Sequence, residues 1–112
     1  MPEIRVTPAE GTVVVRAGGA VIAESTAALV LEEDGYDPVF YIPRGDIGMN
    51  FLEASNKTST CPHKGQARYF HIAGKSGLIR DAAWSYESPH EAVAAISGFL
   101  AFYSDKAAVE LL

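Results

Sequence analysis

The chain has 112 residues, of which 48% are hydrophobic and 21% are charged, and its formal net charge is −5. This length predicts a single domain, residues 1–112, with enough chain to bury a core. The acidic balance disfavours a nucleic-acid partner, because such affinity depends on basic groups that neutralise phosphates. The chain has no apolar run long enough for a membrane span and no secretory signal at its start, so we expect a cytoplasmic protein without a membrane partner.

The first part of the chain is predicted to form a β-meander. Residues 12–16 and 20–24 are mostly apolar or β-branched, and they flank Gly18-Gly19, a pair that favours a tight hairpin turn. Residues 27–32 extend the predicted meander, and residues 33–35 turn the chain.

The middle of the chain is predicted to hold a strand and a short helical turn. Residues 39–42 are β-branched and aromatic, and Pro43 ends this strand because proline lacks a backbone N–H for the ladder. Residues 46–52 predict one helical turn with Asp46 as its N-cap. Three apolar side chains of this turn are expected to point inward: Ile47, Phe51 and Leu52.

The second half of the chain predicts a hairpin, a short helix and two further strands. Residues 67–72 and 78–86 have strand composition and are joined by a glycine-rich loop at 74–77. Ser88-Pro89 resembles a helix start, with serine as N-cap and proline at the first helical position. The expected helix covers residues 89 to about 97, and the last two strands cover residues 99–103 and 108–111.

The segment 58–70 holds the only cysteine, Cys61, close to Lys64. An ammonium near a thiol increases the fraction of reactive thiolate, so Cys61 and Lys64 are candidate catalytic residues. The alternative is that Cys61 is a small buried apolar residue, the commonest state of a lone cysteine. Cys61, His63 and His71 do not have the spacing of a known metal site, and one cysteine excludes both a disulfide within the chain and paired Cys-x-x-Cys knuckles. We therefore expect no metal site and no cofactor.

A second group of residues is aromatic and polar, and it lies near predicted strand ends. Its members are Tyr41, Arg44, Asp46, Trp84, Tyr86, Glu87 and Tyr103. Aromatic walls with a few polar groups are typical of small-molecule pockets. Aromatic strand residues are also common in cores, and Arg44 with Asp46 could form an ion pair that shapes a turn, so both interpretations remain open here. Glu24-Ser25 has no hydrolase elbow around it, and the common phosphate-binding loops are not present in the sequence.

Four motifs occur in a characteristic order along the chain. They are Tyr41-x-Pro43-Arg44-x-Asp46, Cys61-Pro62-x-Lys64-Gly65-x-Ala67, Ala83-Trp84-x-Tyr86-x-x-Pro89 and Ile96-x-Gly98-x-x-x-Phe102-Tyr103. Together with Glu24-Ser25 they resemble the small bacterial family called domain of unknown function 427, which sometimes carries a nucleotidyltransferase-type name. The resemblance covers the chain from about Val13 to about Val109, and in it position 63 is a variable slot.

This resemblance implies a mainly β fold of the β-tent type, with antiparallel sheets and one or two short helices. Methionine sulfoxide reductase B, formaldehyde-activating enzymes and the thalidomide-binding domain of cereblon share that fold. Many such proteins carry zinc on two Cys-x-x-Cys knuckles, whereas this chain lacks the cysteines for them. Its sheets are therefore expected to close through packing alone.

Three hypotheses for function follow. The first is a small-molecule-binding domain, in which an aromatic-lined pocket takes a polar or anionic ligand through Glu24, Tyr41, Arg44, Asp46, Lys64, Trp84 and Tyr86. The second is an enzyme with Cys61 as nucleophile or redox thiol, tuned by Lys64, or a nucleotidyltransferase as the family label suggests. The third is a structural or interaction module, in which Lys64 pairs with Asp46 or Glu87. We favour the first, and the sequence leaves the presence of catalysis and the oligomeric state open.

Overall fold

The computed structural model describes residues 3–112, which form ten strands and three short 3-10 helices. The strands are β1 (Ile4–Pro8), β2 (Val13–Ala17), β3 (Ala20–Ser25), β4 (Leu29–Glu33), β5 (Val39–Tyr41), β6 (Leu52–Cys61), β7 (Gly65–Gly74), β8 (Gly77–Tyr86), β9 (Leu100–Phe102) and β10 (Ala108–Leu111). The helices are η1 (Arg44–Asp46), η2 (Met49–Phe51) and η3 (Glu91–Ile96). None of the helices in this part of the chain has the length and apolar character needed to cross a membrane.

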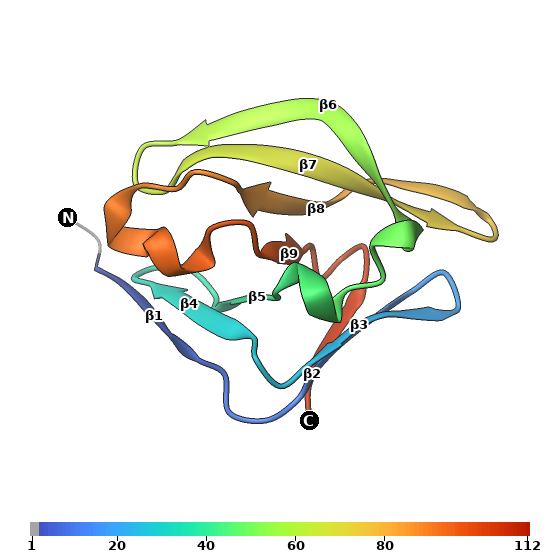
Figure 1. Ribbon diagram of the computed structural model, residues 1–112, viewed down its shortest axis with the longest axis horizontal. Helices are drawn as coiled ribbons and strands as arrows, with labels where there is room; N and C mark the ends of the chain where they lie inside the picture. The colour runs from blue at the N-terminus through green and yellow to red at the C-terminus, as the bar shows by residue number, and fades with distance from the viewer. Residues whose placement is uncertain (1–2) are drawn as a thin grey trace.

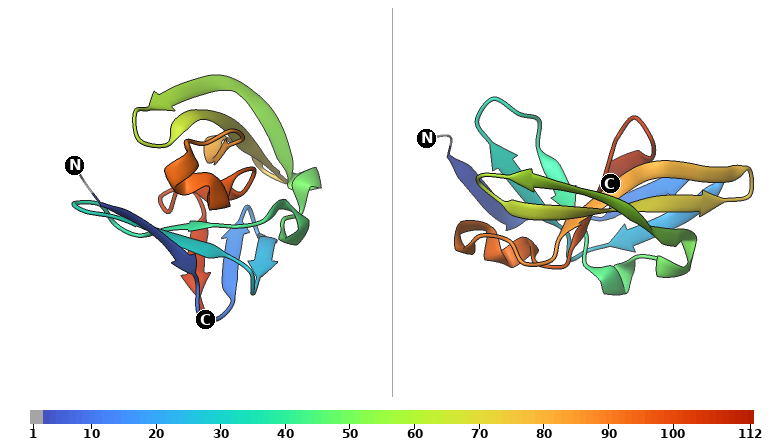
Figure 2. Two further views of the ribbon diagram at one scale, coloured as in Figure 1. Left: turned by 60° about the vertical axis from the view of Figure 1, so that its left-hand side comes forward. Right: turned by 90° about the horizontal axis from the view of Figure 1, so that it is seen from above.

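The strands form three antiparallel sheets (Figures 1 and 2). The large sheet has the order β6-β7-β8-β9, the N-terminal sheet β1-β4-β5, and the hairpin sheet β10-β2-β3. One isolated bridge, between Ile42 and Leu100, connects the end of β5 to β9. The predicted mainly β, antiparallel class with short helices is confirmed.

The glycine pair after β2 forms the predicted hairpin turn. Gly18 and Gly19 have φ values of +57° and +79°, which is the left-handed backbone that a type I′ hairpin turn requires at both positions. The prediction that the next strand extends the same meander is wrong, because β4 pairs with β1 and β5 instead. The chain leaves the hairpin sheet at Ser25, whose side chain accepts a hydrogen bond from the backbone N–H of Ala27 at 3.0 Å and so forms a local turn.

The helical turn predicted for residues 46–52 is replaced by two 3-10 turns and the start of a strand. Asp46 lies inside η1 and is not an N-cap. Its carboxylate accepts a hydrogen bond from the Ser25 hydroxyl at 2.6 Å, which fixes η1 against the end of β3. Leu52 begins β6, an edge strand that the sequence analysis did not predict upstream of the cysteine.

The helix predicted from Pro89 is shorter and starts later than expected. Its N-cap position is taken by His90, with no side-chain cap hydrogen bond, and Ser88 lies outside it. The backbone N–H of His90 instead donates to the carbonyl of Lys64 at 2.9 Å. This contact fixes η3 against the turn that follows Cys61.

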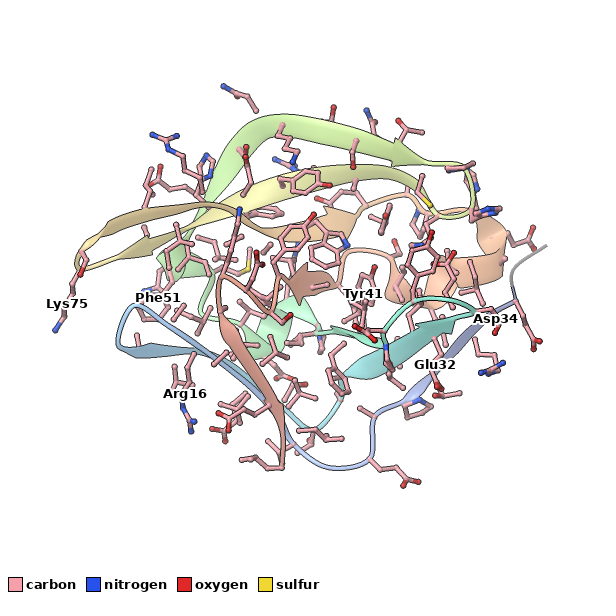
Figure 3. All side chains as sticks on the ribbon, turned by 180° about the vertical axis from the view of Figure 1, so that it is seen from behind. Arg16, Glu32, Asp34, Tyr41, Phe51 and Lys75 are labelled. Carbon is pink, nitrogen blue, oxygen red and sulfur yellow. The ribbon has the colours of Figure 1, made fainter. Side chains whose placement is uncertain are left out.

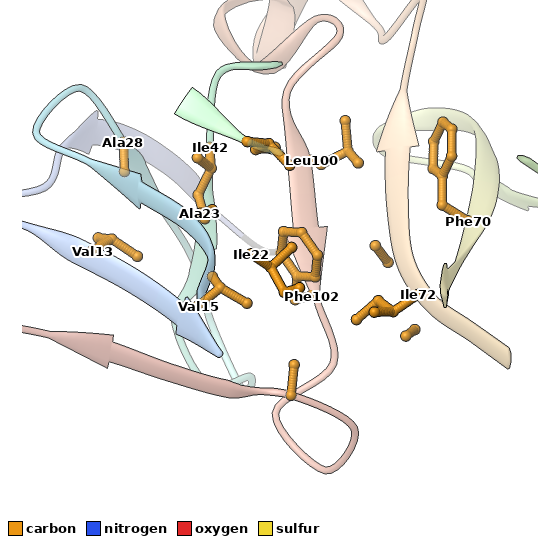
Figure 4. Packing of buried hydrophobic residues seen from close by; sticks show 14 residues of the cluster. Val13, Val15, Ile22, Ala23, Ala28, Ile42, Phe70, Ile72, Leu100 and Phe102 are labelled. Carbon is orange, nitrogen blue, oxygen red and sulfur yellow. The ribbon is translucent and has the colours of Figure 1, made fainter. Parts of the chain in front are cut away.

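Two clusters of buried side chains pack on opposite faces of the large sheet. The first is aliphatic and joins this sheet to the hairpin sheet through Val13, Ile22, Ile72 and Leu100, among others (Figure 4). The second contains three tyrosines among aliphatic side chains and joins the large sheet to the N-terminal sheet and η3. Side chains alternate between the faces of a strand, so Ile72 of β7 contributes to the first cluster and Tyr69 of the same strand to the second.

Candidate functional site

A cavity of about 490 Å³ lies between the N-terminal sheet and the large sheet. Five aromatic side chains that belong to the second cluster or pack against it line the cavity, together with one ion pair, and a sixth, Tyr36, borders it while 72% exposed. We call it the aromatic cavity. The five aromatic side chains are Tyr41, Tyr69, Trp84, Tyr86 and Tyr103, and the ion pair joins Glu33 to Lys64.

Strand periodicity explains why these residues meet. On β8, Trp84 and Tyr86 are two residues apart and therefore share a face, and across the ladder Trp84 pairs with Tyr69 of β7. In the N-terminal sheet, Tyr41 of β5 and Glu33 of β4 lie on strands whose alternate residues face the same cavity. Figure 3 shows Tyr41 near the centre of the molecule, away from Lys75 at the tip of the β7–β8 hairpin.

Trp84 is held between two tyrosines. Its indole N–H donates a hydrogen bond to the Tyr41 hydroxyl at 3.2 Å, and the two rings are almost perpendicular, with centroids 6.3 Å apart. The Tyr103 ring lies on the other side, with its centroid 4.5 Å from that of Trp84 and its plane tilted by 41°. Such contacts stabilise aromatic pairs beyond their buried area, so Trp84 has a fixed orientation in the cavity wall.

Burial keeps the phenols of this site protonated. Tyr41 is 1% exposed and Tyr86 is 7% exposed. Removal from water disfavours a phenolate, and this burial raises the pKa of Tyr86 to about 12. It also raises the pKa of Tyr41 and of Tyr103. At neutral pH these side chains are therefore uncharged donors and acceptors.

The Lys64 ammonium binds the Glu33 carboxylate at 2.9 Å, and the two side chains are only 13% and 11% exposed. Lys64 is placed by the turn between β6 and β7, which ends at Gly65 with φ +114°, a conformation that L side chains rarely adopt. Isolated charges are costly to remove from water, so each of these groups depends on the other. The pairing of Lys64 with Asp46 or Glu87 that the third hypothesis predicted is therefore wrong.

Cys61 is the last residue of β6, and its free thiol is half-buried. It lines the aromatic cavity together with His63 and Lys64, and its side chain also packs against the second cluster. The thiol therefore lies in the cavity wall and also contacts the second cluster of buried side chains.

The predicted ligand-binding residues separate into two groups. Tyr41, Lys64, Trp84 and Tyr86 all line the aromatic cavity, as does the catalytic candidate Cys61. The other three lie elsewhere: Glu24 is exposed on β3, Asp46 binds Ser25, and Arg44 binds Glu87.

The proposed ion pair of Arg44 with Asp46 is replaced by one with Glu87. A single guanidinium nitrogen of Arg44 donates to both carboxylate oxygens, at 2.8 and 2.9 Å. Arg68 lies 3.5 Å from the same carboxylate, and both guanidinium groups lie over the Phe70 ring. This cluster belongs to the face of the large sheet that carries the aliphatic core, and it connects η1 to the end of β8.

Glu33 and Tyr69 are the main cavity residues that the sequence analysis missed. Glu33 was placed in a turn, whereas it is the last residue of β4. The alternation Leu31, Glu33 would have indicated that Glu33 faces inward with a buried leucine. Tyr69 lies two residues after the buried Ala67 in a predicted strand, so the same alternation would have selected it.

In the part of the chain that the structure describes, no group of three or more histidine, cysteine, aspartate or glutamate side chains is arranged to hold a metal ion. No curated protein matches the sequence. A family model labelled NTP_transf_9 matches residues 5–111, nearly the whole chain. The match confirms the predicted family resemblance, and the chain belongs to the family described as Domain of unknown function (DUF427).

Proposed function

We propose that this protein binds a small polar molecule in the aromatic cavity. The observation that carries the proposal is the convergence of five aromatic side chains and a nearly enclosed ion pair on one cavity from segments far apart in the sequence. Small-molecule sites are typically concave, mostly apolar and lined by aromatic side chains with a few placed polar groups. The volume of about 490 Å³ lies within the usual range for such sites.

A purely structural role explains the ion pair poorly. Replacing a buried ion pair with apolar side chains of similar size is often neutral or stabilising. Lys64 and Glu33 are nevertheless held at 2.9 Å beside tyrosines and a tryptophan. A ligand that forms hydrogen bonds with Lys64 or Glu33 would explain why charged side chains are present here, which packing alone does not explain.

The cavity also has room for an extended ligand. A second cavity of about 380 Å³ shares Trp84 and Tyr103 with the aromatic cavity, and Val39 and Asp37 border both. A ligand with a ring at Trp84 and a substituent beyond Tyr103 would occupy both spaces.

The single tryptophan allows a direct test. Because Trp84 is the only tryptophan and lines the aromatic cavity and the adjoining second cavity, its indole NMR signal and fluorescence report on these two spaces and on no other tryptophan. We would screen a library of polar fragments and keep those that shift the Trp84 indole signal. Val39→Arg fills the cavity and should abolish these shifts, whereas Val21→Arg, at an exposed valine of β3 (49% exposed), should preserve them. If no fragment shifts the indole signal, or if Val39→Arg leaves the shifts intact, the proposal is wrong.

A second candidate function uses the thiol. Cys61 lines the same cavity as Lys64 and Trp84, which is the arrangement that an enzyme with a cysteine nucleophile requires. Lys64 is engaged with Glu33, so thiolate stabilisation by its ammonium requires that pair to open. Titration of the native protein with an aromatic disulfide reagent tests this candidate. Reaction only after unfolding would eliminate it, while rapid native reaction that a cavity-binding fragment blocks would favour it.

A further inference from the structure

The Tyr86 side chain lines the aromatic cavity, and its hydroxyl has no protein partner among the described residues. The side chain is 7% exposed. Within residues 3–112, Arg44 Nε is the one side-chain polar atom that is sealed from solvent without a partner, so the Tyr86 hydroxyl stays accessible at the cavity. A donor that faces a cavity is satisfied there by water or by a ligand.

The Tyr41 hydroxyl offers a second donor at the same place. Its oxygen accepts the indole N–H of Trp84, and within the described residues its own proton has no acceptor. Tyr86 and Cys61 are close enough to Tyr41 to contribute to the raised pKa of its phenol. Two phenolic hydroxyls with protons free to donate therefore lie near each other in the cavity wall. An oxygen with two lone pairs, as in a carbonyl group, can accept both.

The charges around this region disfavour an anion. The lining residues include two carboxylates, Glu33 and Asp37, and one lysine, Lys64. Lys64 is already engaged by Glu33 at 2.9 Å. Glu33 also lies close enough to Tyr41 and Tyr86 to disfavour negative charge on either phenol. An anionic ligand oxygen at the same position would meet the same repulsion.

We propose that the ligand of the aromatic cavity places an uncharged carbonyl oxygen between the hydroxyls of Tyr86 and Tyr41, with the attached group packed against Trp84. The inference rests on the proposed small-molecule function and narrows its ligand class from polar compounds in general to neutral carbonyl compounds such as amides. It replaces the anionic ligand that the sequence suggested, because Arg44 is not at the cavity and Lys64 is already paired.

Three probes of nearly equal shape and different charge test this class. Benzamide is neutral, benzoate is an anion and benzamidinium is a cation, and each would be titrated against the Trp84 indole NMR signal. We expect benzamide to bind about tenfold more tightly than benzoate. Equal or tighter binding of benzoate overturns the inference, and so does tightest binding by benzamidinium. Either result still places a ligand in the cavity and leaves the proposed function standing.

A hydroxyl deletion locates the contact. Tyr86→Phe removes only the unpartnered hydroxyl, so we expect it to weaken benzamide binding about fivefold, as for one lost neutral hydrogen bond. The melting temperature should stay unchanged, because no protein contact is lost. Tyr36→Phe is the control, since this residue also borders the cavity but is 72% exposed; it should bind benzamide normally. Unchanged affinity in Tyr86→Phe overturns the inference, as does the lack of a Trp84 shift with all three probes. The proposed function fails on different results, namely if the whole fragment library gives no shift or if Val39→Arg leaves the shifts intact.

Discussion

The ion pair between Lys64 and Glu33 provides a sharp test of how the cavity wall is stabilised. Lys64→Met and Glu33→Gln each remove one charge while nearly preserving side-chain size. At the observed 2.9 Å separation, the attraction is about 6 kcal/mol if an effective dielectric constant of roughly 20 applies. Most of this gain is offset by the cost of removing both charges from water. The difference in unfolding free energy between the single variants and the double variant therefore measures how strongly each charge depends on the other.

Breaking a fully buried pair by removing one partner costs about 3–5 kcal/mol. Here the side chains retain 13% and 11% exposure beside a cavity, so water compensates part of the loss. We expect each single substitution to reduce the free energy of unfolding by about 2–3 kcal/mol, and the melting temperature by roughly 8–12 °C. The double variant should lose only about 1–2 kcal/mol, because it leaves no uncompensated charge.

Urea unfolding at pH 7, followed by circular dichroism, measures these free energies and gives the coupling energy of the double-mutant cycle. Arg16→Met is the control, because Arg16 and Glu110 form a close pair whose side chains are 52% and 45% exposed. It should cost less than about 1 kcal/mol. Additive losses in the Lys64 and Glu33 variants, with a coupling energy near zero, would refute the claim that each charge depends on the other.

Three further predictions concern single sites. Gly65→Ala should reduce the free energy of unfolding by about 1–3 kcal/mol, because φ is +114° at this position. Gly45→Ala is the control and should be nearly neutral in the same urea titration, because its added methyl group meets open space. Burial raises the pKa of Tyr86 from 10.0 to about 12 and also raises the pKa of Tyr41 and Tyr103, so the stability that depends on these neutral phenols is complete below pH 10 and is lost as pH rises above it. Urea unfolding between pH 8 and 11 should show this fall, and a flat profile would contradict it. The hydrogen bond from Ser55 is the largest factor that lowers the pKa of Asp81. Ser55→Ala should therefore raise the pKa of Asp81 in a carboxylate NMR titration. An unchanged pKa would show that another group is responsible.

The fold could be predicted where local chemistry determines it. Gly18 and Gly19 supply the backbone of a hairpin turn, and Pro43 ends the ladder of the preceding strand. The ten-residue strand β6 was missed because its sequence is mostly polar and its burial pattern shows no regular alternation. It becomes a strand only because β7 offers a long ladder beside it, and such tertiary pairing leaves little local signal.

The candidate site could be predicted in part for a related reason. Trp84 and Tyr86 were selected as aromatic residues near the end of a predicted strand, and strand alternation, which puts residues two apart on one face, brings both to the cavity. Arg44 was selected as a polar residue beside Tyr41, but Ile42 already packs in the first cluster while Tyr41 packs in the second, and Arg44 lies over Phe70 of the first cluster. Arg44 therefore reaches Glu87 instead of the cavity. Lys64 was selected without its partner, because the pairing with Glu33 spans 31 positions and depends on how two sheets meet.

One face of the large sheet contributes mainly to stability, and the opposite face carries the proposed binding site. One face packs aliphatic side chains such as Ile72 and Leu100 against the hairpin sheet, and both are fully buried. The opposite face carries Tyr69, Trp84 and Tyr86, whose polar atoms would be costly in a sealed core unless each were paired. Tyr69 is paired with Ser59 at 2.8 Å and Trp84 with Tyr41, which leaves the Tyr86 hydroxyl exposed to the cavity. A core selected for packing alone would place phenylalanine at such a position, since removal of an unpartnered hydroxyl costs no hydrogen bond. The tyrosine at position 86 is thus better explained by what enters the cavity than by what holds the sheets together.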